Sequence, residues 1–172
     1  MEVSGYFISA FVRKSIEILQ QAGVPEHAEG KTVYNQLKNA VTTLDRDLVV
    51  QVFNWLCKSS DAAVIGNTLQ LGLWLARNMP YDARQYFDAH VFTGLFTRVG
   101  SVLGAADKHL LFLARILGDK ADDDCDWERS AFWYKAIVEA VPESHIGDAN
   151  LANFTTHALK KLTVLARRAK NY

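Results

Sequence analysis

The chain has 172 residues, of which 49% are hydrophobic and 22% charged, a composition typical of globular proteins and unlike that of disordered tails. Lysine plus arginine equal aspartate plus glutamate at 19 each, which excludes the broad positive field that draws proteins to DNA or anionic membranes. No apolar run approaches the roughly 20 residues that span a bilayer, and the first residues carry an acid instead of a basic leader. We therefore predict one soluble domain over residues 1–172, located in the cytoplasm with the nucleus not excluded.

The first third of the chain has the apolar periodicity of helices. Apolar residues recur there at intervals of three and four, which places them on one face of a helix. This spacing predicts helices over residues 6–21, 32–42 and 47–58, and the side-chain oxygens of Thr43 and Asp45 are the two candidates to cap the third. The third segment is rich in β-branched and aromatic residues, so a strand over residues 48–53 is the alternative interpretation.

The middle of the chain predicts the central helix of the fold. The Ser-Ser-Asp sequence at 59–61 is a helix-start signal, and the residues after it are apolar nearly all round as far as Met79. A helix with no polar face belongs in the core. Pro80 ends this helix, and the following apolar row predicts another over residues 82–102.

Three more helices are predicted in the last third of the chain. A compact helix over residues 110–117 begins at a cap on Asp107, and Gly118 ends it and opens a polar loop. The next helix covers residues 126–141, and Asp148 opens the last one. The buried row of this last helix is predicted to be Leu151, Phe154, Ala158, Leu162 and Leu165.

These segments predict an all-α protein of about eight helices joined by short connections. No linker is rich enough in proline, glycine or serine to separate two domains. Helices of this length pack either as antiparallel hairpins stacked into an armadillo-like superhelix or as a closed helical bundle. We favour the stacked arrangement and keep the bundle as the alternative.

Two stretches carry a family resemblance: the sequence NTLQLGLWLARN at residues 67–78, and the apolar row from Tyr86 to Val99. Together they resemble the armadillo/HEAT-like helical superfamily, and within it the VHS and ENTH-type adaptor domains. The resemblance implies a helical scaffold that binds peptides or membrane-associated partners and performs no chemistry. No family binding motif is matched, so no binding residue is transferred.

The helix predicted over residues 126–141 carries the strongest candidate for a binding surface. Its aromatic residues include adjacent ones, which occupy more than one helix face, so at least one ring should be exposed beside the preceding acidic loop. Exposed tryptophan and tyrosine dominate the energetics of protein interfaces. The predicted partner-binding residues are Trp127, Trp133, Tyr134, Asp123 and Asp124. Packing of these rings against the last helix, with the acids as a solvated capping loop, is the alternative.

The basic end of the chain suggests a second kind of partner. Lys160, Lys161, Arg167 and Arg168 could contact the phosphates of a nucleic acid. Ordinary solvated charge near a helix C-terminus, where cations are favourable, is the alternative interpretation.

Chemical signatures are missing from the sequence. It contains no phosphate-binding glycine loop, no GxSxG, no HExxH and no CxxC, and no two of its five histidines stand three or four residues apart. We therefore predict no catalytic residue, cofactor or metal site. The favoured function is a non-enzymatic helical interaction module or subunit of a larger assembly that binds a protein segment on a groove or face between helices. An RNA- or DNA-associated protein that uses the basic C-terminal helix is the alternative, and a homo-oligomer is left open.

Overall fold

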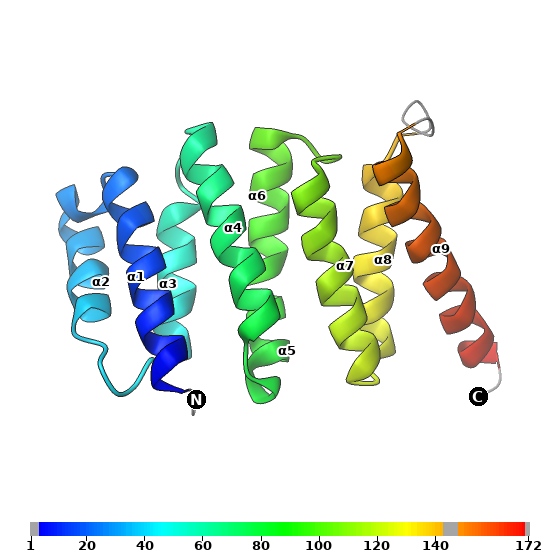
Figure 1. Ribbon diagram of the computed structural model, residues 1–172, viewed down its shortest axis with the longest axis horizontal. Coiled ribbons are helices and arrows are strands. Elements are labelled where there is room, and N and C mark those ends of the chain that lie inside the picture. The colour runs from blue at the N-terminus through cyan, green and yellow to red at the C-terminus, as the bar shows by residue number, and fades with distance from the viewer. Residues whose placement is uncertain (1–3, 143–147, 171–172) are drawn as a thin grey trace. The chain divides into compact units, whose positions relative to one another are not determined.

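The computed structural model describes residues 4–142 and 148–170, and every regular element in them is a helix. Helix makes up 83% of the described residues, which confirms the all-α prediction and shows that the alternative of a strand over residues 48–53 is wrong. Eight of the helices have eleven residues or more. The helices in chain order are α1 (Gly5–Gln21), α2 (Ala28–Lys38), α3 (Arg46–Leu56), α4 (Ala62–Asn78), α5 (Arg84–Phe87), α6 (Thr93–Leu103), α7 (Lys108–Asp123), α8 (Trp127–Ala140) and α9 (Ala149–Lys170) (Figure 1).

The chain divides into two compact units, the first ending at Leu103 and the second beginning at Gly104. Unit 1 contains α1 to α6, and unit 2 contains α7 to α9. Each unit has its own buried apolar residues. The single domain over residues 1–172 stays a prediction. In the described residues, no helix is both long and apolar enough to cross a membrane.

The core of unit 1 forms around α4, as the sequence predicts for its most apolar helix. α4 packs against α1, α3 and α6. Aromatic rings fill the space between α1, α3 and α4: the ring of Phe11 lies 6.5 Å from that of Phe53 and 6.4 Å from that of Trp74. Gly72 of α4 lies against the side chain of Leu95 on α6, where a Cβ would clash with that leucine and would lie 3.8 Å from Cε1 of Phe53. The absence of a side chain at this position allows α4 and α6 to approach closely.

Helix α2 begins and ends four residues earlier than predicted. The prediction placed it at residues 32–42, whereas the structure has it at Ala28–Lys38. The start is earlier because Val24 and Pro25 form a short 3₁₀ turn that leads directly into the helix. Gly30 then packs on the backbone of Val24, where no larger residue would fit.

The predicted helix over residues 82–102 is interrupted by a change of helix type. A 3₁₀ turn at Tyr81–Ala83 leads into α5, a π-helical turn occupies Asp88–Phe92, and α6 follows. The hydroxyl of Thr93 donates a hydrogen bond of 2.9 Å to the carbonyl of Asp88 across this wide turn. The segment is helical as predicted, but it is not a regular α-helix throughout.

Unit 2 consists of three long helices, with α8 packed against both α7 and α9 (Figure 1). The prediction that Gly118 ends a compact helix is wrong, because α7 continues to Asp123. Gly118 is required for packing instead. A Cβ on it would lie 2.7 Å from Cε1 of Tyr134 on α8, so only glycine leaves room for that ring.

Side-chain caps begin the helices where the sequence places them. Carboxylate oxygens accept hydrogen bonds from backbone N–H groups of the first turn at Asp45, Asp61, Asp107 and Asp126. Asp148 accepts one from the N–H of Asn150 in the same way. The predicted caps at Asp45 and Asp107 and the predicted helix starts at residues 59–61 and Asp148 are confirmed.

Candidate functional site

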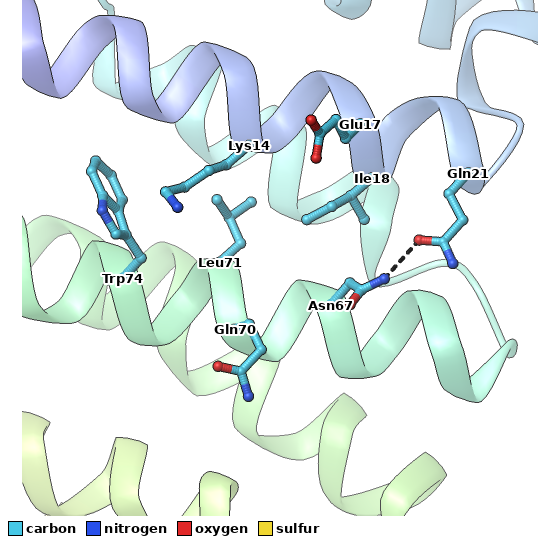
Figure 2. A pocket seen from close by; sticks show the side chains of 8 residues that line it. All are labelled: Lys14, Glu17, Ile18, Gln21, Asn67, Gln70, Leu71 and Trp74. Atoms are coloured by element: carbon cyan, nitrogen blue, oxygen red, sulfur yellow. Dashed lines mark hydrogen bonds between the residues drawn. The ribbon is translucent and has the colours of Figure 1, made fainter.

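A solvent-open groove of about 300 Å³ lies between α1 and α4 in unit 1 (Figure 2). Its floor is apolar and consists of Ile18 and Leu71, both buried. Trp74 forms one end, and a hydrogen bond of 2.8 Å from Asn67 Nδ2 to Gln21 Oε1 joins the two helices at the other. The remaining lining residues are Lys14, Glu17 and Gln70.

The walls of this groove are rich in carboxamides. Gln21 on α1 and Asn67 and Gln70 on α4 are exposed at its rim. A carboxamide has two N–H donors and one carbonyl acceptor, so the bond between Asn67 and Gln21 leaves donors and an acceptor on both residues for a ligand. Such groups match the alternating N–H and C=O groups of a peptide backbone.

Lys14 and Glu17 place one positive and one negative group on the α1 side of the groove, so its formal charge is balanced. The ammonium of Lys14 lies 6.0 Å from the centre of the Trp74 ring. At that distance a cation is attracted to the ring face. The tryptophan end of the groove is thus both apolar and able to interact with a cation.

The aromatic residues that the sequence singles out separate into two environments. Trp127 is 36% exposed, and Phe132, five residues further along α8, is 51% exposed, so the prediction of an exposed ring in α8 is confirmed. Trp133 and Tyr134 are fully buried, and their assignment as partner contacts is therefore corrected. The helix that carries them, α8, packs against both α7 and α9.

Tyr134 takes part in a polar cluster that joins the three helices of unit 2. Its hydroxyl donates a hydrogen bond of 2.5 Å to Asp119 Oδ1 on α7, and Nε2 of His157 on α9 lies 2.9 Å from the same oxygen. Burial and the Asp119 carboxylate raise the pKa of Tyr134 far above its ordinary value. A hydroxyl that holds its proton so firmly is a structural donor and a poor acid or base.

The acidic segment and the basic helix, which the sequence offers as two different binding surfaces, contact each other. Asp122 accepts a hydrogen bond of 3.0 Å from Lys161 Nζ, and Nη1 of Arg168 lies 3.4 Å from its other oxygen. The guanidinium of Arg168 also lies 4.4 Å from the centre of the Trp127 ring. Three of the predicted contact residues are therefore engaged within unit 2.

The remaining predicted residues differ in their surroundings. Asp124 pairs with Arg129 at 3.6 Å, which fixes it next to the start of α8. Asp123, Lys160 and Arg167 are exposed, and within the described part of the chain they make no ion pair. The structure does not gather these three side chains into one site.

Sequence reasoning missed the groove between α1 and α4. A signal for it exists on α4, where Asn67, Gln70 and Trp74 are spaced by three and four residues. This spacing places two carboxamides and an indole in one row on a helix made mostly of apolar residues. The partner helix is not apparent from the sequence, because Gln21 lies 46 positions away from Asn67.

Over residues 4–142 and 148–170, no group of three or more His, Cys, Asp or Glu side chains could hold a metal ion. Both cysteines, Cys57 and Cys125, are free thiols. Comparisons of the chain with protein-family models, curated proteins and solved structures found no match.

Proposed function

We propose that the protein is a non-enzymatic, armadillo-like helical interaction module that holds a short protein segment in the groove between α1 and α4. The observation that supports this function is the composition of the groove: an apolar floor, carboxamides at the rim and an indole at one end. Carboxamides supply hydrogen bonds to a backbone, and the floor and the indole supply apolar contact for side chains.

The dimensions of the groove suit a few residues of extended chain. Asn67 and Trp74 are seven positions apart on α4, which at 1.5 Å per residue separates them by about 10 Å. An extended segment advances about 3.3 Å per residue, so about three residues fit along the groove. A segment of this size binds weakly alone and gains affinity when its flanks contact the helices on either side.

The charge of the groove favours a protein segment over a polyanion. Lys14 is the one cation in the lining, and Glu17 opposes it on the same helix. A nucleic acid would need several cations to offset its phosphates. The Trp74 end, where Lys14 approaches the ring, favours an apolar or aromatic side chain in the bound segment.

Selection of short peptides from a displayed random library, followed by measurement of their affinity in solution, tests the proposal. The decisive variant is Gln70→Trp, because Gln70 is exposed at the rim and a bulky ring there blocks the groove without disturbing the core. Peptides selected on the wild-type protein should bind this variant at least about tenfold more weakly.

Gln36→Trp is the matched control, since Gln36 is an exposed glutamine on α2 that does not line the groove. Selected peptides should bind it as they bind the wild-type protein. Equal affinity for Gln70→Trp and wild type, or failure to select any peptide, would reject the groove as a site for a protein segment.

A further inference from the structure

A second groove, of about 330 Å³, lies between α7 and α9 in unit 2 and has a different chemical character. On the α7 side it is lined by Lys108, His109, Phe112 and Arg115. On the α9 side it is lined by Asn150, Asn153 and Phe154. No lining residue is acidic, so the groove combines basic side chains, carboxamides and aromatic rings without a carboxylate.

The two rings form an aromatic surface at the centre of the groove. Phe112 and Phe154 come from different helices, and their centroids are 6.5 Å apart with planes inclined by 57°. Both side chains are partly exposed. A ring that faces solvent beside cations offers a flat apolar surface on which another planar group can stack.

The cations and the ring of α7 alternate along one face of the helix. Lys108, Phe112 and Arg115 are spaced by four and three residues, so they lie in one row. The row spans about 10 Å from Lys108 to Arg115, with the ring between the two charges. A ligand that carries an anionic group on each side of a planar group would match this order.

The charge of the groove is largely available for a ligand. Lys108 is exposed and, in the described residues, its side chain makes no hydrogen bond or ion pair. Arg115 lies 3.9 Å from Asp119 Oδ2, a long contact, while Asp119 bonds more closely to Tyr134 and His157 through its other oxygen. The net charge of the lining therefore favours an anion.

The acids that cap the two lining helices are engaged with the backbone. Asp107 accepts hydrogen bonds of 2.9 and 3.1 Å from N–H groups at the start of α7. Asp148 accepts bonds of 2.9 and 3.4 Å at the start of α9. α7 and α9 run in the same direction, so both capped N-termini lie at one end of the groove (Figure 1). Lys108 is the first residue of α7 and supplies the positive charge at this end.

We propose that the groove between α7 and α9 binds single-stranded nucleic acid. Lys108 and Arg115 contact phosphates, Phe112 and Phe154 stack on bases, and the carboxamides of Asn150 and Asn153 hydrogen-bond to base edges. A groove that joins cations to aromatic rings suits this ligand because bases present flat faces and phosphates present charge at regular intervals. The site is independent of the groove between α1 and α4. It uses none of the four basic residues at positions 160–161 and 167–168.

Fluorescence anisotropy with a labelled oligouridylate of about ten nucleotides tests the proposal, with titrations at about 50 and 200 mM salt. The double variant Lys108→Gln with Arg115→Gln should bind roughly tenfold or more weakly at low salt. The slope of log affinity against log salt concentration should be smaller in magnitude by about two, one for each phosphate contact removed. Phe154→Leu should bind about tenfold more weakly while keeping the wild-type salt dependence, because it removes stacking and not charge.

The double variant Lys160→Gln with Arg167→Gln is the matched control, because it removes the same charge from exposed positions of α9 outside the groove. It should bind the oligonucleotide like the wild-type protein. Circular dichroism establishes that each variant is folded, and the substitutions of the exposed Lys108 and the partly exposed Arg115 decide the result if Phe154→Leu unfolds.

Three results would overturn the proposal. The first is no binding of the oligonucleotide by the wild-type protein at low salt. The second is an equal loss in the control and groove variants, which would assign binding to general charge. The third is displacement of the oligonucleotide by an equimolar peptide of alternating aspartate and phenylalanine, which would assign the groove to an acidic protein segment.

Discussion

The hydroxyl of Tyr134 donates a hydrogen bond of 2.5 Å to Asp119 Oδ1, and the ring that carries this hydroxyl rests on Gly118, the residue next to that aspartate. Tyr134 belongs to α8, whereas Gly118 and Asp119 are adjacent on α7. His157 brings α9 to the same carboxylate oxygen. One side chain therefore makes both an apolar and a polar connection between the helices of unit 2.

Tyr134→Phe should lower the free energy of unfolding of the protein by about 1–2 kcal/mol. The variant keeps the ring on Gly118 but removes the donor, so Asp119 loses one of its two closest hydrogen-bond partners. Urea denaturation followed by circular dichroism measures the change. Tyr81→Phe, at a tyrosine that is 70% exposed, should leave the stability unchanged. Equal stability of Tyr134→Phe and wild type would show that the bond contributes nothing.

Alkaline pH should destabilise the wild-type protein more than Tyr134→Phe. The pKa of Tyr134 in the folded state lies far above the value of 10.0 that tyrosine has when unfolded. The stabilisation is therefore complete below pH 10 and falls as the unfolded state ionises above it, by at most about 1.4 kcal/mol per pH unit. Unfolding curves from pH 8.5 to about pH 11 measure this effect. A constant difference between the two proteins over that range would contradict it.

Gly118→Ala should destabilise the protein by about 1–3 kcal/mol, although alanine favours helices more than glycine does. The added Cβ would lie 2.7 Å from the Tyr134 ring, which its hydrogen bond to Asp119 holds in place. Gly66→Ala is the control, because Gly66 lies inside α4 and an added Cβ there would have nothing within 4 Å apart from the adjoining backbone of α4 itself. Thermal unfolding should show a gain of up to about 1 kcal/mol for the control. A gain in both variants would contradict the proposed packing.

Asp122→Asn should lower stability by less than about 1 kcal/mol at low salt, and the difference should disappear at about 1 M salt. The substitution removes the charge that pairs with Lys161 and Arg168, but these side chains are 36% and 44% exposed and are well screened. Asp123→Asn removes the same charge at an exposed position without an ion pair in the described residues. Urea titrations at both salt concentrations compare the two. An equal effect of the two substitutions would show that the ion pairs add no stability.

The helices were predictable because their signals are local. Asp45, Asp61 and Asp107 cap helices within three residues of their own positions, so a short stretch of sequence contains the whole interaction. Gly118 shows where local reasoning fails. Glycine near the end of an apolar row usually ends a helix, and only its contact with Tyr134, sixteen residues later, explains why this one does not.

The candidate sites were less predictable, because burial depends on how many faces of a helix are covered. Trp133 and Tyr134 are adjacent and point in different directions, so one of them would be exposed if a single helix covered α8. Two helices cover it, and both rings are buried. In the same way, the sequence around Asp122 and around Arg168 predicts two separate charged surfaces. In the folded protein these two side chains form an ion pair with each other.

The π turn at Asp88–Phe92 has a consequence for how the length of this chain can vary. A π turn holds one residue more than an α turn, so losing one residue there restores a regular helix from Arg84 to Leu103. A deletion inside an ordinary α-helix instead rotates everything after it by about 100°, which would turn Leu95 away from Gly72. In homologous chains, a one-residue gap in this helix is therefore expected at the wide turn, where the core on both sides keeps its orientation.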